Sequence, residues 1–247
     1  MKDVLLHCTL AKCHSYQNVT YANISSNQIS DFEKSRQDVQ SIIQKYNLIK
    51  NTRYIDKQEL QKIDKDNFRQ SNDIIIRRSD YSSSSLEDIC SSNKENSIIV
   101  ALDQLTDHNN LGNIIRTCLL IGVNGIIIPE HSSATITRST ANTSAGAIEL
   151  LKFHISKNLN KSLEDLKKIG YWTYALDMKG KLINNNFRFD KKTIIILGNE
   201  GKGIRKNILN NSDFIISLPQ DEIRGIDSYN AANSLAMTLF HYKVNIS

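Results

Sequence analysis

The chain has 247 residues and is 40% hydrophobic, which is enough to bury one large core or two smaller ones. Its net charge of +5, from 31 basic and 26 acidic residues, permits a polyanionic partner without requiring one. No apolar stretch reaches the length of a membrane span, and residues 1–13 are too polar for a signal peptide, so we expect a cytoplasmic protein with no membrane partner.

The distribution of glycine and proline indicates how the chain is divided into domains. All ten glycines and both prolines fall between Gly112 and Gly225. We therefore predict a small α/β module over 1–80, a serine-rich linker over 81–95 and a compact domain over 96–247. The four cysteines lack the paired spacing of a zinc site, so we expect no metal.

The N-terminal module has weak signals. We predict a helix over Asp31–Tyr46, a strand region over Asn47–Ile55, a short helix over Lys57–Ile63 and a strand over Ile74–Ile76. Residues 1–30 show almost no periodicity, so no element is predicted there.

The C-terminal domain has a clearer pattern, in which strands alternate with helices. Apolar residues at helical spacing follow Asn110 and recur from Ala232 to Phe240, which predicts two amphipathic helices. Alternation of this kind predicts an α/β fold with a mostly parallel sheet covered by helices on both faces. The predicted strands are Ser97–Leu102, Gly125–Ile128, Leu150–Ile155, Tyr171–Leu176, Thr193–Leu197 and Phe214–Leu218. One predicted helix begins near Asn110, and the others are Arg138–Ile148, Asn160–Ile169, Gly203–Asn210 and Ser228–Tyr242.

A first polar motif lies where strand Ser97–Leu102 leads into a helix. It contains Asn110, Gly112 and Arg116. Asn110 could simply cap the helix, and Arg116 could be an ordinary surface residue. Open α/β sheets bind ligands at the carboxyl ends of their strands, so both side chains are also candidates for a site.

A second motif, Gly198 to Gly203, follows the strand Thr193–Leu197. Glycines there let backbone amides approach a ligand, but the spacing fits neither a phosphate-binding P-loop nor a dinucleotide fingerprint. Taken alone it is most often a plain turn. Glu200 could hold a ligand hydroxyl or amide, or be a solvated acid near a helix N-terminus.

A third motif opens the last helix. Ser228 is a plausible N-cap, whereas Asn230 and Asn233 occupy first-turn positions at which a good helix would prefer Ala or Leu. Two side-chain amides beside an apolar stripe therefore indicate hydrogen bonds to a specific partner group.

Together the motifs resemble those of the SpoU (TrmH-type) ribose 2′-O-methyltransferases of the SPOUT superfamily. N-x-G-x-x-x-R, G-x-E-G-x-G and S-L-N occur here in order, with Tyr229 in place of the usual leucine. His108 replaces a common proline, and Ala232 a frequent second serine. The resemblance covers about 96–244 and implies S-adenosylmethionine as cofactor, a C-terminal deep trefoil knot and an obligate homodimer with the site at its interface.

The resemblance also implies residue roles. Arg116 lies nearest the 2′-hydroxyl, as a base or as a cation that stabilises the developing alkoxide. A guanidinium has a pKa above about 12, which makes the first role demanding. The implied catalytic residues are Asn110, Arg116, Glu200, Ser228 and Asn230, and the implied cofactor contacts are Gly198, Glu200, Gly203, Leu218, Tyr229 and Asn230.

The N-terminal module more weakly resembles the L30e-like domain of 23S rRNA guanosine methyltransferases, best over Ile42–Arg78. This resemblance implies RNA as substrate, with a guanosine of 23S rRNA first and tRNA second. Two alternatives stay open. One is a catalytically silent RNA-binding protein of the same fold, and the other is a nucleotide-dependent dehydrogenase that uses the Gly198 loop.

Overall fold

A computed structural model describes two groups of elements, one N-terminal and one C-terminal. Three strands, β1 (Asn18–Ala22), β2 (Thr52–Ile55) and β3 (Ile74–Arg77), form a sheet in the order β2-β1-β3. β1 pairs parallel to β2 and antiparallel to β3. The residues described are 18–22, 52–55, 74–77, 83–90, 96–131, 133–134, 136–221 and 228–245.

The N-terminal strands agree with the sequence in part. β2 and β3 lie where strands were predicted, whereas β1 lies in a stretch without periodic signal. The predicted helices Asp31–Tyr46 and Lys57–Ile63 fall outside the described residues.

The segment predicted as a linker contains a short helix, α3 (Leu86–Cys90), whose Ile89 is buried. Just before it, the Ser84 amide donates to the Phe153 carbonyl at 2.6 Å, and the Ser83 hydroxyl accepts from the Ile155 amide at 2.8 Å. This stretch therefore packs along an edge of the larger sheet.

The larger sheet has six strands in the order β6-β5-β4-β8-β7-β9, and every described pairing in it is parallel. This confirms the predicted mostly parallel sheet. The strands are β4 (Ser97–Leu102), β5 (Gly125–Pro129), β6 (Phe153–Ser156), β7 (Trp172–Leu182), β8 (Lys192–Leu197) and β9 (Phe214–Ser217).

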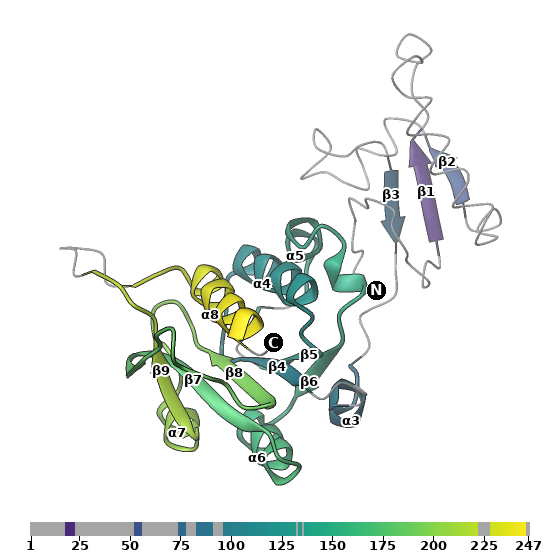
Figure 1. The fold of residues 1–247 in the computed structure, drawn as a ribbon. Coiled ribbons are helices and arrows are strands. Elements are labelled where there is room, and N and C mark those ends of the chain that lie inside the picture. Colours follow the sequence, from purple (N-terminus) through teal and green to yellow (C-terminus); the bar gives the residue numbers. More distant parts are fainter. Residues whose placement is uncertain are drawn as a thin grey trace.

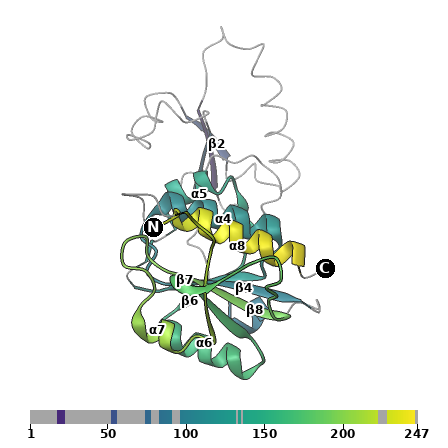
Figure 2. The ribbon, with the colours of Figure 1, turned by 60° about the vertical axis from the view of Figure 1, so that its left-hand side comes forward.

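Helices cover both faces of this sheet, as predicted (Figures 1 and 2). Alternate β4 residues divide between two cores. Ile98 and Val100 pack with the helices of one face, and Ile99 and Ala101 with those of the other. One face carries α4 (His108–Ile121), α5 (Arg138–Thr143) and α8 (Ala231–Asn245), and the other α3, α6 (Leu159–Lys168) and α7 (Lys206–Asn210).

Local chemistry explains where two of the helices begin and end. Asp107 caps α4 by accepting the Asn110 amide at 2.6 Å, so the predicted alternative that Asn110 itself is the cap is wrong. The predicted helix Arg138–Ile148 is interrupted, because Ala145 and Gly146 adopt positive φ angles of 50° and 82°. A short 3-10 helix, Ala147–Glu149, follows.

α4 and α5 approach each other closely at Gly112. A Cβ atom there would lie 2.6 Å from the Thr143 Cβ and 2.9 Å from the Thr140 carbonyl oxygen. Asn109 strengthens the contact by accepting from the Ser139 hydroxyl at 2.9 Å. The first motif therefore contains a glycine for packing reasons, two residues after Asn110.

α8 packs against α4 through Leu235 and Leu239, which are fully buried. The apolar stripe predicted for α8 also included Phe240, whose side chain is 63% exposed, so that part of the prediction is wrong. Among the described residues, no helix is both long and apolar enough to cross a membrane.

Candidate active site

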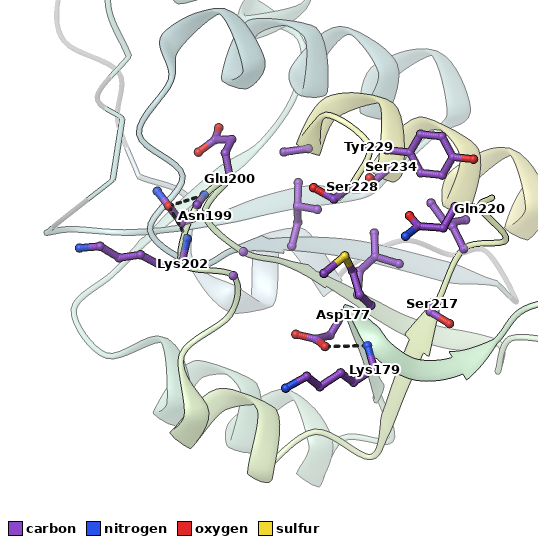
Figure 3. Close-up of a pocket in the computed structure, with 18 residues that line it drawn as sticks. Asp177, Lys179, Asn199, Glu200, Lys202, Ser217, Gln220, Ser228, Tyr229 and Ser234 are labelled. Carbon is purple, nitrogen blue, oxygen red and sulfur yellow. Dashed lines mark hydrogen bonds between the residues drawn. The ribbon is translucent and has the colours of Figure 1, made fainter. Parts of the chain in front are cut away.

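A cavity of about 570 Å³ lies at the carboxyl ends of β8 and β9, beside residues 176–179 within β7 and against the start of α8 (Figure 3). Parallel strands end together at this edge, which is where open α/β sheets bind ligands. The cavity brings together residues predicted from the second and third motifs. Those that line it are Gly198, Glu200, Gly203, Leu218, Ser228 and Tyr229.

The loop after β8 folds back on itself. The Asn199 amide donates to the Gly203 carbonyl at 3.1 Å, and the Gly203 amide donates to the Asn199 carbonyl at 2.9 Å. A Cβ at Gly198 would lie 2.3 Å from the Gly203 carbonyl carbon, and Gly203 has a φ of +68°. A side chain at Gly198 would therefore force the loop to move, and the backbone conformation of Gly203 is one that other residues adopt only with strain.

Asn199 organises this loop through its side chain, a role that the sequence analysis missed. Its Oδ1 accepts the Gly201 and Lys202 amides, both at 3.0 Å. Its Nδ2 donates to the Gln104 carbonyl at 3.0 Å, which ties the loop to the connection after β4. Asn beside Gly in a tight loop was the available signal, because Asn side chains commonly bond the backbone two residues on.

Residues from all three motifs join in one hydrogen-bond chain beside the cavity. Asn110 Nδ2 donates to Glu200 Oε1 at 2.9 Å, and Asn230 Nδ2 donates to Asn110 Oδ1 at 3.0 Å. Because both ends of the Asn110 amide are used, its orientation is set. The Glu200 carboxylate is therefore held at one fixed place at the cavity.

Asn230 also caps α8. Its Oδ1 accepts the Ala232 amide at 2.9 Å and the Asn233 amide at 3.4 Å, so the prediction that Ser228 is the N-cap is wrong. Ser228 instead lines the cavity. One carboxamide thus starts the helix and orients Asn110.

Tyr229, which replaces the usual leucine, forms a further link. Its hydroxyl donates to the Pro219 carbonyl at 2.9 Å, joining the start of α8 to the segment after β9. Ala232, at the position of the frequent second serine, is buried in the core, whereas Ser234 lines the cavity. A hydroxyl is therefore present on this stretch of α8, but two residues later.

The middle of β7 is a part of the site that the sequence analysis did not predict. Asp177 and Lys179 line the cavity, and Asp177 Oδ1 accepts the Lys179 amide at 2.9 Å (Figure 3). An acid directly after the apolar strand Tyr171–Leu176 was the available signal. With Glu200 and Lys202, the lining holds two carboxylates and two ammonium groups, so neither sign of charge dominates.

Arg116 is the predicted site residue that the structure leaves apart. It lies on the exposed face of α4, does not line the cavity, and makes no hydrogen bond or ion pair with another described residue. Leu120, one turn further along α4, is 78% exposed. Within the described parts of the chain, no group of three His, Cys, Asp or Glu side chains could hold a metal ion.

The fold and the site define the class: a parallel α/β protein with a cavity at the carboxyl edge of its sheet. Residues 97–240 match the model of the SpoU rRNA Methylase family, which is more than half of the chain. The chain therefore belongs to the SpoU methylase family.

Two relatives agree with this assignment, and a solved structure has a similar fold. An uncharacterized tRNA/rRNA methyltransferase of Borreliella burgdorferi is 39% identical over 61% of this chain, and a putative TrmH family tRNA/rRNA methyltransferase of Staphylococcus aureus is 35% identical over 60%. The chain spans 65% and 58% of the length of these two relatives. The SpoU methyltransferase AviRb of Streptomyces viridochromogenes, solved with AdoMet, has a similar fold, with a TM-score of 0.73, 18% identity and coverage of 93% of this chain and 82% of that one.

Proposed function

We propose that the protein transfers a methyl group from S-adenosylmethionine to a ribose 2′-hydroxyl of RNA. The hydrogen-bond chain Asn230–Asn110–Glu200 carries the proposal, because it joins the three family motifs at one cavity. Names of the relatives, which mention tRNA and rRNA, and a neighbour solved with AdoMet support it.

The cavity fits such a cofactor. Its volume of about 570 Å³ is within the range of small-molecule sites. Leu176, Leu197 and Leu218 offer an apolar wall for a flat base, while lining carboxylates and loop amides can bond hydroxyl, ammonium and carboxylate groups. S-adenosylmethionine, when bound, supplies a methyl group activated by a positive sulfonium. Gly198, Gly203, Leu218, Tyr229 and the other lining residues named above would hold it.

We infer that the chain's own residues act by positioning and charge. A guanidinium acts in proteins as a cation and not as a base, so we assign Arg116 to stabilising a developing alkoxide or an adjacent phosphate. Asn110, held by Asn230, fixes Glu200, whose second carboxylate oxygen can orient Arg116 or the ribose. Ser228 adds a hydroxyl to the cavity lining.

The position of Arg116 favours a homodimer with the active site at its interface. Exposed apolar side chains on a neighbouring helix pair are typical of a partner surface. Leu120 of α4 and Phe240, Val244 and Met237 of α8 are 78%, 63%, 53% and 38% exposed. We propose that two copies pack through this surface, so that Arg116 of one copy approaches the cavity of the other.

The strand order favours the deep trefoil knot. β8 lies between β4 and β7, and α8 returns from the edge strand β9 to pack on α4. A C-terminal segment that returns in this way can pass through a loop formed earlier in the chain. We propose that it does so.

For the substrate we propose a guanosine of 23S rRNA, bound with help from an L30e-like module over 1–80, in the cytoplasm. The mixed strands β1, β2 and β3 are compatible with a small α/β module. Purified protein with radiolabelled S-adenosylmethionine should label protein-free 23S rRNA more than tRNA, and mapping of 2′-O-methylated positions in total RNA with and without the protein should identify the nucleotide. Labelling of tRNA alone would replace the rRNA assignment, and binding of RNA without transfer would indicate a silent protein.

A further inference from the structure

We propose that Asp103 and Arg205 form a pair that positions the loop 198–205, and with it the cofactor cavity; this inference rests on the proposed function. Asp103 directly follows β4 and its side chain is fully buried. The Arg205 amide donates to Asp103 Oδ2 at 2.8 Å, and Arg205 Nε and Nη2 lie 2.8 and 2.7 Å from Asp103 Oδ1.

Asp103 holds both ends of the loop. At the start, its backbone amide donates to the Leu197 carbonyl at 2.7 Å, directly before Gly198. At the far end, its carboxylate binds the main chain and the side chain of Arg205. The intervening residues, which include Glu200, form one wall of the cavity (Figure 3). A single residue therefore sets the span of that wall.

The neighbouring backbone supports a positioning role. Gln104 has a φ of 60°, a conformation that costs energy for a residue other than glycine. Its carbonyl accepts from Asn199 Nδ2 at 3.0 Å, which ties the middle of the loop to the same connection. Strain adjacent to a site, held by the contacts around it, is typical of functional geometry.

Net stability is a weak reason for this pair. Removing a carboxylate from water costs about as much as a buried ion pair returns, so an apolar pair of similar size would serve a core equally well. The Arg205 side chain is 40% exposed while the Asp103 side chain is fully buried, so the charge points inward from the loop. The pair instead fixes the position and orientation of the loop end. A planar guanidinium and the backbone amide of the same residue bind one carboxylate in a single geometry.

The same connection leads to Asn110. Residues 103–107 run from β4 to the cap of α4, and Asn110 donates to Glu200 from the first turn of that helix. The Asp103–Arg205 pair thus sets the distance between the two loops that the Asn110–Glu200 bond spans. We classify Asp103 and Arg205 as positioning residues, since neither lines the cavity.

The test uses the 247-residue chain with two substitutions: Arg205→Met removes the guanidinium, and Arg205→Lys keeps the positive charge. Lys206→Met is the matched control, because Lys206 is the next residue, exposed, and outside the cavity lining. Amide hydrogen exchange reports loop opening, and titration calorimetry with S-adenosylmethionine reports the cavity.

For Arg205→Met we expect exchange in peptides over 198–205 to quicken about tenfold, and the Kd for S-adenosylmethionine to rise about tenfold, at temperatures well below unfolding. Arg205→Lys should recover part of both changes, and Lys206→Met should match the wild type. Unchanged exchange in the loop would overturn the proposal. So would faster exchange spread evenly over the domain with a matching loss of thermal stability, because that pattern indicates a purely structural role.

The two proposals fail in different ways. If the wild type binds no S-adenosylmethionine, the proposed function fails, and the exchange measurements still decide whether Arg205 holds the loop. If the wild type binds it and Arg205→Met binds equally well, the positioning inference fails and the proposed function stands.

Discussion

The cavity loop and the exposed face of α4 are built in opposite ways. The loop 198–205 is held by side chains from within it and by the connection after β4, through Asn199 and Asp103. Arg116 and its helical neighbour Leu120 are exposed, and Arg116 has no hydrogen-bond partner in the described parts of the chain.

This difference indicates a division of labour. One copy of the chain contains the proposed cofactor cavity, whereas Arg116, the positive charge proposed for the reacting hydroxyl, does not line it. We infer that cofactor binding belongs to the single chain and methyl transfer to the pair. Substitutions should therefore separate the two steps.

The largest separation should come from Arg116→Ala. Removing one preorganised cation from a developing alkoxide should lower the transfer rate about a thousandfold. The Kd for S-adenosylmethionine should change less than about twofold, because Arg116 does not line the cavity. Single-turnover labelling and calorimetry measure the two quantities. Asn113→Ala, on the same exposed helix face, is the control. Equal losses of both would contradict the division.

Gly198→Ala should instead weaken cofactor binding. The added methyl would lie 2.3 Å from the Gly203 carbonyl carbon, so the loop must open and cofactor affinity should fall about a hundredfold. Gly201→Ala provides the comparison, because its Cβ meets only Asn199 Oδ1, at 3.7 Å. Calorimetry should therefore show a much smaller change, within about threefold. Similar affinities for the two variants would show that the loop is not a fixed wall.

Phe240→Asp tests the pairing of copies. A charge on this exposed aromatic position should convert a dimer to a monomer in light scattering and lower transfer about tenfold, while cofactor affinity holds. Ile169→Asp is the matched control, since Ile169 is 51% exposed and follows α6, which covers the opposite face of the sheet. A monomeric wild type, or a fully active monomeric variant, would remove the interface from the mechanism.

Asp213→Asn should give the smallest effect, a loss of stability without a change in cofactor binding. Burial alone would raise the pKa of Asp213, but bonds from Lys167 and from the backbone and hydroxyl of Thr173 outweigh it and lower that pKa. A lowered pKa stabilises the fold above the ordinary aspartate value of about 4, and this contribution is lost as pH falls through the lower folded value.

The expected loss for Asp213→Asn is about 1 kcal/mol in the free energy of unfolding at pH 7, and the gap from the wild type should narrow toward pH 3. Urea titrations at both values measure it. Because Asp213 precedes β9, at the end of that strand away from the cavity, cofactor affinity should not change. A matching loss of affinity would link that end of the strand to the site.

Much of this arrangement could be predicted because local chemistry encodes it. A continuous apolar run located Ser97–Leu102 with its observed bounds, and the apolar residues at helical spacing after Asn110 include Cys118, which is buried. Burial raises the pKa of its thiol, as expected for a cysteine that acts as a hydrophobe. Glycines at Gly198 and Gly203 marked the folded loop correctly.

Other features depend on partners that are distant in sequence. Nothing near Asp103 indicates that its carboxylate meets Arg205, 102 residues later. A carboxylate that caps a helix looks locally like any acid, so Asp107 was overlooked in favour of Asn110. Phe240 follows the apolar spacing of α8 yet is exposed, because spacing alone does not say whether a helix face meets this chain or another copy.

The bond from Asn110 to Glu200 spans 90 residues of chain, and the bond from Asn230 to Asn110 spans 120. Contacts of such separation form late, because a long stretch must be ordered before they add any stability. During synthesis, Asn110 of α4 leaves the ribosome long before Glu200 and Asn230 have been added to the chain. A nascent chain therefore cannot form the hydrogen-bond chain Asn230–Asn110–Glu200, on which the proposed methyl transfer depends, before α8 has been synthesised.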